Sequence, residues 1–205
     1  MKDITIAKFI EDLSSKKPVP GGGGASALIG AVSAALCSMA ANLTSGKKKY
    51  AEYQPDIERI LLQSAEKASK LLDLIKKDAE VFEPLAAAYR IPKDEPDRDE
   101  RLESALVKAC SVPMEILKEA AGLLALVEEL SKKGTKLAIS DVGVSACACR
   151  SAIEGAVMNV YINTKLMKNR SYALQINKEA TDILNDGITG CNRIYAKITD
   201  ELRAE

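Results

Sequence analysis

Pro18-Val19-Pro20-Gly21-Gly22-Gly23-Gly24-Ala25-Ser26 opens a stretch that contains no charged residue from Pro18 to Leu43. After the glycines, this stretch predicts a helix that continues to about Ser45. The length would allow a membrane span, but its many Ala, Gly and Ser residues favour a buried helix that touches other helices on several sides. The larger apolar residues share one side of that helix, namely Leu28, Ile29, Val32, Leu36, Met39 and Leu43. Small and polar residues share another side, namely Ser26, Gly30, Ser33, Cys37 and Thr44.

Helical periodicity continues on both sides of this stretch. Apolar residues recur at three- and four-residue spacing over residues 3–16, 55–89, 99–133 and 139–167, and again from 171 almost to the end. The apolar face of the first segment consists of Ile6, Phe9, Ile10 and Leu13. Pro84 and Pro113 are expected to kink their helices, and Gly134 to stop one. No strand-like alternation, repeat or domain boundary is evident, so we expect an all-α, single-domain multi-helix bundle over residues 1–205.

Composition excludes several classes of function. Lys plus Arg equals Asp plus Glu at 29 each, and aromatic residues make up 4% of the chain, so neither a basic surface nor a base-stacking platform for nucleic acid is expected. Histidine is absent, which excludes Ser-His-Asp and Cys-His sites and His-ligated metals. Acid–base chemistry near pH 7 must therefore use a carboxylate, Lys, Tyr or Cys with a shifted pKa.

The five cysteines are odd in number, and their spacing matches no zinc site. The simplest interpretation is that they are small buried hydrophobes. The beginning of the chain carries charges throughout, which does not resemble a signal peptide. We expect a cytoplasmic protein with no metal and no membrane partner.

The glycine run is the first candidate binding element. Gly21 to Gly24 precede a helix, so backbone N–H groups and the partial positive charge of the helix start could hold a carboxylate, a phosphate or a carbonyl-rich ring. The run matches neither a Walker A loop nor a dinucleotide fingerprint. The alternative is a tight turn that lets helices pack closely.

The predicted helix over residues 139–167 carries the second candidate. Asp141, Asn159 and Asn163 fall on one face among small residues, and such polar groups suit a site that hydrogen-bonds a polar ring. The alternative is that Asp141 caps the helix and the asparagines bond neighbouring backbone. Arg150 and Glu154 lie on the opposite side as an ordinary surface pair.

Two further positions are candidates. Asp78 lies at the edge of an apolar stripe, where partial burial would raise the pKa of its carboxyl group and let it move protons, unless it is simply a solvated edge residue. Lys47, Lys48 and Lys49 could meet an anionic tail, although such a run is more often a solvated turn.

Three segments together resemble the formiminotetrahydrofolate cyclodeaminase / methenyltetrahydrofolate cyclohydrolase family. They are residues 18–26 quoted above, Lys77-Asp78-Ala79-Glu80-Val81-Phe82, and Ser140-Asp141-Val142-Gly143-Val144 running on to Asn159-Val160-Tyr161-Ile162-Asn163. Ala88-Tyr89-Arg90-Ile91-Pro92-Lys93 and Val112-Pro113 also fit. The resemblance covers essentially the whole chain, and the fourth glycine is unusual, which leaves the register of the loop open.

The resemblance implies an all-helical homodimer that acts on a tetrahydrofolate derivative without a further cofactor. The chain is too short to hold a fused formiminotransferase, so it resembles a stand-alone form. By the same resemblance, Asp141 is the first candidate for the catalytic or ring-orienting carboxylate and Asp78 the second, as a proton shuttle. The turn formed by Gly21, Gly22, Gly23 and Gly24, together with Ser26, Asn159 and Asn163, would hold the folate, and Lys47 its glutamate tail.

Three functions remain open at this point. The first is hydrolysis of 5,10-methenyltetrahydrofolate to 10-formyltetrahydrofolate. The second is release of ammonia from 5-formiminotetrahydrofolate, which leads to the same methenyl cation. The third is a helical folate-binding or scaffold protein without catalysis. The two reactions share a tetrahedral carbon between two folate nitrogens, and each needs proton transfer that a carboxylate can supply.

Overall fold

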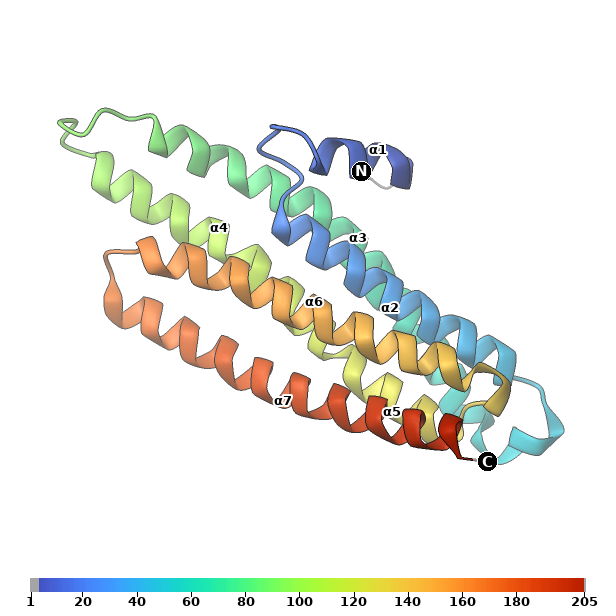
Figure 1. Cartoon of the computed structure of the whole chain (residues 1–205). Helices are drawn as coiled ribbons and strands as arrows, with labels where there is room; N and C mark the ends of the chain where they lie inside the picture. The colour runs from blue at the N-terminus through green and yellow to red at the C-terminus, as the bar shows by residue number, and fades with distance from the viewer. Residues whose placement is uncertain (1–3, 205) are drawn as a thin grey trace.

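A computed structural model describes residues 4–204 of the chain, and within them it is an all-α bundle, as predicted (Figure 1). A short helix leads into a set of long, roughly antiparallel helices. In chain order the elements are α1 (Ile6–Leu13), α2 (Gly22–Thr44), the 3₁₀ turn η1 (Lys48–Tyr53), α3 (Gln54–Tyr89), α4 (Arg98–Ala121), α5 (Leu123–Lys133), the 3₁₀ turn η2 (Lys136–Ala138), α6 (Ile139–Leu166) and α7 (Arg170–Arg203).

The boundaries of the long helices follow the sequence closely except in the segment over residues 99–133. The segment expected as a single helix over residues 99–133 is two helices, because the chain breaks at Gly122 rather than at Pro113. At position 122 a Cβ would meet only the flexible end of the Lys67 side chain, which can move aside, so the break follows from the local backbone rather than from a steric requirement for glycine. Pro84 lies inside α3, which continues for five more residues to Tyr89.

The first predicted helix is shorter than expected, and its apolar face is only partly buried. α1 covers residues 6–13 of the predicted 3–16, and residue 3 lies outside the described residues. Phe9 is buried, whereas Ile6 and Ile10 are exposed, so the bundle covers only part of the apolar face of this helix. The reason is that α1 stands at the edge of the bundle (Figure 1), where only one narrow side meets other helices.

α2 is a core helix that packs between α3 and α6 through its small residues. Gly30, Ser33 and Cys37 are buried in this contact. The Ser33 hydroxyl donates to the carbonyl oxygen of Ser145 on α6 at 2.9 Å, and the Ser145 hydroxyl donates to the carbonyl oxygen of Ser33 at 2.9 Å. Small side chains let the two backbones approach, and each hydroxyl is satisfied inside the core by the backbone carbonyl of the other serine.

Most of the larger apolar residues of α2 face away from the core, although Leu28 packs against it. Ile29, Val32, Met39 and Leu43 are exposed, because the small-residue side already fills the close contact with α3 and α6. The expectation of a helix buried on several sides is therefore only half correct. By length and composition α2 could also cross a membrane, although 56% of its most apolar window is buried inside the bundle.

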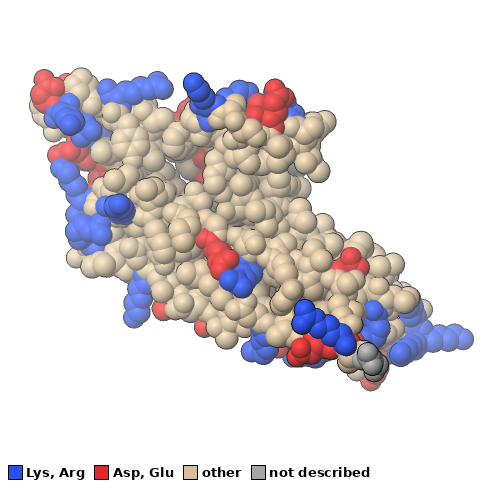
Figure 2. All heavy atoms as spheres, in the orientation of Figure 1, with Lys and Arg blue, Asp and Glu red and all other residues tan. Residues whose placement is uncertain are grey.

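α6 packs against α2 and also exposes large apolar residues, namely Val144, Met158, Ile162 and Leu166. We call the exposed apolar residues of the two helices, which also include Ile29, Val32, Met39 and Leu43, the α2/α6 face. α2 contains no charged residue, and α6 contains only Asp141, Arg150, Glu154 and Lys165. Figure 2 shows a broad surface over these helices with few charged side chains.

The buried serine pair should be sensitive to loss of its hydroxyls. Ser33→Val removes a donor and adds a methyl group in a close helix contact, so we expect a loss of about 1–3 kcal/mol in the free energy of unfolding, measured by urea denaturation. Ser140→Val, an exposed change on α6, is the control and should stay within about 0.5 kcal/mol. Equal midpoints for Ser33→Val and the wild type would contradict the role of this pair.

Candidate active site

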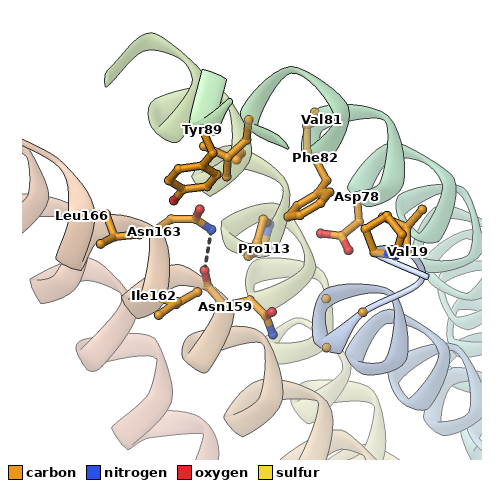
Figure 3. A pocket seen from close by; sticks show the side chains of 16 residues that line it. Val19, Asp78, Val81, Phe82, Tyr89, Pro113, Asn159, Ile162, Asn163 and Leu166 are labelled. Carbon is orange, nitrogen blue, oxygen red and sulfur yellow. Dashed lines mark hydrogen bonds between the residues drawn. The ribbon is translucent and has the colours of Figure 1, made fainter. Parts of the chain in front are cut away.

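A cavity of about 240 Å³ lies at one end of the bundle, where the start of α2 meets α3, α4 and the end of α6 (Figure 3). Its walls are mainly apolar, with a few polar groups between them. It is lined by Pro18, Val19, Gly21, Gly22, Gly23, Asp78, Val81, Phe82, Leu85, Tyr89, Ala109, Pro113, Asn159, Ile162, Asn163 and Leu166. Such a shape, closed on several sides by helices, is typical of a ligand site.

The glycine run gives two polar side chains room to approach the backbone of α2. A Cβ at position 23 would overlap the carboxylate of Asp78, and one at position 22 would lie 3.1 Å from the amide atoms of Asn159. None of these glycines has a positive φ, so close approach rather than an unusual backbone explains them. The tight-packing and ligand-binding interpretations of the run are thus compatible.

Asp78 reaches from α3 to the first turn of α2. Gly21, the residue before the helix, has no side chain with which to cap it. Instead the carboxylate of Asp78 accepts a hydrogen bond from the N–H of Gly24. Burial raises the pKa of the Asp78 carboxyl group above its ordinary value, and the bond from Gly24 opposes that shift only in part. As expected from the sequence, this carboxyl group is partly desolvated and suited to proton transfer.

Asn159 and Asn163 line the cavity from α6, one turn apart. Asn159 donates its amide N–H to the carbonyl oxygen of Gly155 at 2.8 Å, and Asn163 donates to that of Asn159 at 2.8 Å (Figure 3). These backbone bonds are the alternative predicted from the sequence. These bonds direct the amide nitrogen of each asparagine toward the backbone of α6. The side-chain oxygens are then left to accept hydrogen bonds from a ligand.

The polar side chains of the cavity are therefore mostly acceptors, and among residues 4–204 no Lys or Arg lines it. Tyr89 supplies a hydroxyl group that stays protonated, because burial raises its pKa. Gly22 and Gly23 belong to the first helical turn, whose N–H groups lack intrahelical acceptors. A ligand that carries positive charge or several N–H donors fits the acceptors of this set.

Two predicted residues lie beside the cavity without lining it. Ser26 is buried, and its hydroxyl donates to the carbonyl oxygen of Gly22 at 2.7 Å while it packs against Gly155. Gly24 packs against Pro20 and Ile75. Both shape the turn that carries Gly22 and Gly23.

Two other predicted residues lie at the opposite end of the bundle. Asp141 and Asn159 are 18 residues apart on α6, which at about 1.5 Å per residue separates them by about 27 Å. Lys47 follows the far end of α2, where its ammonium group donates to the hydroxyl of Thr135 at 3.3 Å. The expectation that these residues share one cleft with the asparagines is wrong within a single chain.

Comparisons with known proteins identify the family of the chain. Residues 5–182 match the sequence model of the formiminotransferase-cyclodeaminase family. The chain is 35% identical to the methenyltetrahydrofolate cyclohydrolase of Methylorubrum extorquens over 202 residues, which are 97% of each protein. The chain belongs to the formiminotransferase-cyclodeaminase family.

Two further relatives show how the family is organised. The formimidoyltransferase-cyclodeaminase of Sus scrofa is 30% identical over 97% of this chain, which matches only 37% of that longer protein. The crystal structure of formiminotetrahydrofolate cyclodeaminase from Thermotoga maritima superposes with a TM-score of 0.84 at 30% identity, covering 97% of this chain and 96% of that one. The family fold therefore occurs both alone and as part of larger proteins.

Several cavity residues were not singled out by the sequence. Phe82, Tyr89 and Pro113 all lie within segments that carried the family resemblance, so the signal was present, although Pro113 was interpreted only as a kink. Ile162 and Leu166 are exposed apolar residues on one edge of α6, and helical periodicity alone gave no reason to choose them. Within the described residues, no group of three or more Cys, Asp or Glu side chains could hold a metal ion.

The approach of Asp78 to α2 can be tested with neighbouring glycines. Gly23→Ala would push the carboxylate away from the N–H of Gly24, so we expect a loss of about 1–3 kcal/mol in the free energy of unfolding together with a large loss of activity. Gly24→Ala is the control, because its nearest contact would be an ordinary 3.4 Å to Pro20. If the two variants unfold at the same urea concentration, the proposed crowding at position 23 is incorrect.

Proposed function

We propose that this protein hydrolyses 5,10-methenyltetrahydrofolate to 10-formyltetrahydrofolate. The observation that carries the proposal is the cavity itself, in which a partly buried carboxylate and two amide oxygens face a space without any Lys or Arg. The methenyl group is a delocalised cation, which such a set of acceptors stabilises. The full-length match to a relative named as a cyclohydrolase supports the same reaction.

The chemistry needs one activated water molecule. As the water oxygen bonds to the methenyl carbon, the Asp78 carboxylate takes one of its protons. The new hydroxyl group then loses its proton as the bond from carbon to N5 breaks, and N5 gains one, so each turnover releases one proton. The first-turn N–H groups of Gly22 and Gly23 are placed to stabilise charge on the attacking oxygen.

Release of ammonia from 5-formiminotetrahydrofolate is the second candidate. It is favoured by the fold match to the cyclodeaminase of Thermotoga maritima. In this reaction N10 attacks the formimino carbon and loses its proton, and the departing nitrogen leaves as ammonia after it gains that proton and a second one from Asp78. A non-catalytic scaffold has less support, because the relatives carry enzyme names.

The cavity fits the ring end of a folate better than the whole molecule. Its volume of about 240 Å³ lies below the roughly 300–1,000 Å³ typical of pockets that enclose drug-sized ligands. The benzoylglutamate part would therefore extend into the open, past Ile162 and Leu166. We propose that no further cofactor is needed, because the substrate itself carries the one-carbon unit.

We also propose that the protein acts as a homodimer in the cytoplasm. The α2/α6 face is a contiguous apolar surface of a kind that marks an interaction site, and a second copy would cover it with an equally uncharged surface. All five cysteines are free thiols, which supports a reducing compartment.

Side-by-side turnover decides between the two reactions. We expect loss of methenyltetrahydrofolate absorbance well above the spontaneous hydrolysis rate, and much slower ammonia release from formiminotetrahydrofolate. Heat-denatured protein is the control for spontaneous hydrolysis. Faster ammonia release would select the second reaction, and no acceleration of either would reject the proposed function.

Asp78→Asn should separate the charge of this residue from its structural role. The amide oxygen can still accept from the N–H of Gly24, so we expect a folded protein whose kcat falls about 10²–10⁴-fold. Because burial raises the pKa of Asp78, the wild type should lose stability as pH rises through that pKa, and the variant should not. The variant should therefore gain stability relative to the wild type between pH 4 and pH 8 in urea titrations.

Glu80→Gln, an exposed change two residues away on α3, is the matched control and should leave both turnover and the pH profile unchanged. Full activity of Asp78→Asn, or a stability difference that does not change with pH, would contradict the assignment of Asp78 as a buried proton acceptor.

A further inference from the structure

Two helices that form the cavity wall each contain a proline in their interior, Pro84 in α3 and Pro113 in α4. Proline has no N–H group, so the carbonyl group four residues earlier loses its usual partner within the helix. The carbonyl groups affected in this way are those of Glu80 and Ala109. The two prolines therefore create two backbone acceptors that the helices themselves do not satisfy.

These two acceptors lie in different surroundings. Pro84 and Glu80 are exposed, so water can reach the carbonyl group of Glu80. Pro113 is buried, and Ala109 is only 5% exposed. A buried carbonyl group without a partner costs free energy, and folded proteins nearly always supply one. The missing partner therefore matters at Ala109 and not at Glu80.

The carbonyl group of Ala109 lies on the wall of the cavity. In an α-helix each carbonyl group points along the axis toward the residue four positions later, which lies on the same side of the helix. Ala109 and Pro113 both line the cavity, so the oxygen between them lies on the same wall. Pro113 faces the same space as Phe82 and Asn163 (Figure 3).

The neighbouring side-chain donors of α4 are directed elsewhere. The hydroxyl group of Ser111 donates to the carbonyl oxygen of Lys108 at 2.7 Å. The thiol group of Cys110 points to the carbonyl oxygen of Val160 on α6 at 3.9 Å. The carbonyl oxygen of Ala109 is therefore available to a donor inside the cavity.

The position of this oxygen indicates which part of a folate can meet it. Ile162 and Leu166 are exposed and mark the mouth of the cavity, whereas Ala109 and Pro113 are buried on its inner wall. The benzoylglutamate part extends past the mouth, so the opposite end of the ring system reaches the inner wall. That end of the pterin ring carries the 2-amino group, which is an N–H donor.

We propose that the backbone oxygen of Ala109, left free by Pro113, accepts a hydrogen bond from the 2-amino group of the folate ring. This inference rests on the proposed function and names a determinant of ring recognition in the same cavity. Pro113 is a positioning residue, because it acts through the carbonyl group of Ala109. The bond lies away from the one-carbon unit, so it stabilises the bound substrate and the transition state alike.

Pro113→Ala supplies the missing N–H group and lets α4 satisfy the carbonyl group of Ala109 internally. Alanine is smaller than proline, so the change does not crowd the ligand. We expect the Kd of 5-formyltetrahydrofolate, measured by calorimetry, and the KM for methenyltetrahydrofolate to rise about 3–10-fold, with kcat changed less than about 2-fold. The urea midpoint should be no lower than that of the wild type, because the new helix bond offsets the smaller side chain.

Pro84→Ala is the matched control, because it makes the same change in α3 at an exposed position. It should leave Kd, KM and kcat unchanged. Unchanged binding by Pro113→Ala, or an equal loss in Pro84→Ala, would overturn the proposal. A wild type that binds 5-formyltetrahydrofolate but turns over neither folate substrate would reject the proposed function, and the binding comparison would still decide the role of Ala109.

A modified ligand separates the hydrogen bond from any change in the shape of α4. In 2-desamino-2-methyl-5-formyltetrahydrofolate a methyl group of similar size replaces the amino group. The wild type should bind this analogue about 3–10-fold more weakly than the parent compound, and Pro113→Ala should not distinguish the two ligands. Equal binding of both ligands by the wild type, or a further loss for the analogue in Pro113→Ala, would contradict the proposed bond. The wild-type comparison decides the question even if Pro113→Ala does not fold.

Discussion

The close approach of α2 to α3 and α6 is the constraint on which the rest of the structure depends. It is possible because one side of α2 consists of glycine, alanine and serine, so that backbones meet where larger side chains would hold them apart. The buried hydroxyls of Ser33 and Ser145 each donate to the backbone carbonyl of the other residue across the contact. This packing fills the inner side of α2 with small residues and leaves Ile29, Val32, Met39 and Leu43 on the outside. The row of small residues on one side of α2 therefore accounts for both the dense core and the apolar outer surface.

The same constraint builds the cavity at the first turn of α2. A helix start needs an acceptor for its N–H groups, and Gly21 has no side chain to supply one. Asp78 supplies it from α3, and only a glycine at position 23 leaves space for it. The carboxylate is thereby held in a partly buried place by a bond that the fold itself requires. The side chain of Asp78 thus caps the start of α2 and is also the candidate catalytic group, so it contributes to both stability and chemistry.

Much of this could be predicted from the sequence, and the failures have specific physical causes. Periodicity placed the long helices to within a few residues, since each has an apolar stripe and a clear stop. It could not say which side of α2 faces inward, because small and large apolar residues both suit a core and only packing distances decide between them. The grouping of Asp141 with Asn159 failed for another reason. Residues that share the face of a helix can still lie about 27 Å apart along it, so angular register alone does not define a site.

A cavity without histidine can still move protons at neutral pH if the charge of the ligand assists. An empty cavity favours the protonated form of Asp78, because burial penalises its charge. A methenyl cation in the same space favours the ionised carboxylate, which can then accept a proton from water. Hydrolysis removes the positive charge while Asp78 takes a proton from the water, so neither the one-carbon group nor the carboxyl group is left as an unpaired buried charge. The substrate therefore loses its positive charge while Asp78 gains a proton. In this way a single desolvated carboxylate can accept the proton for which many enzymes use an imidazole.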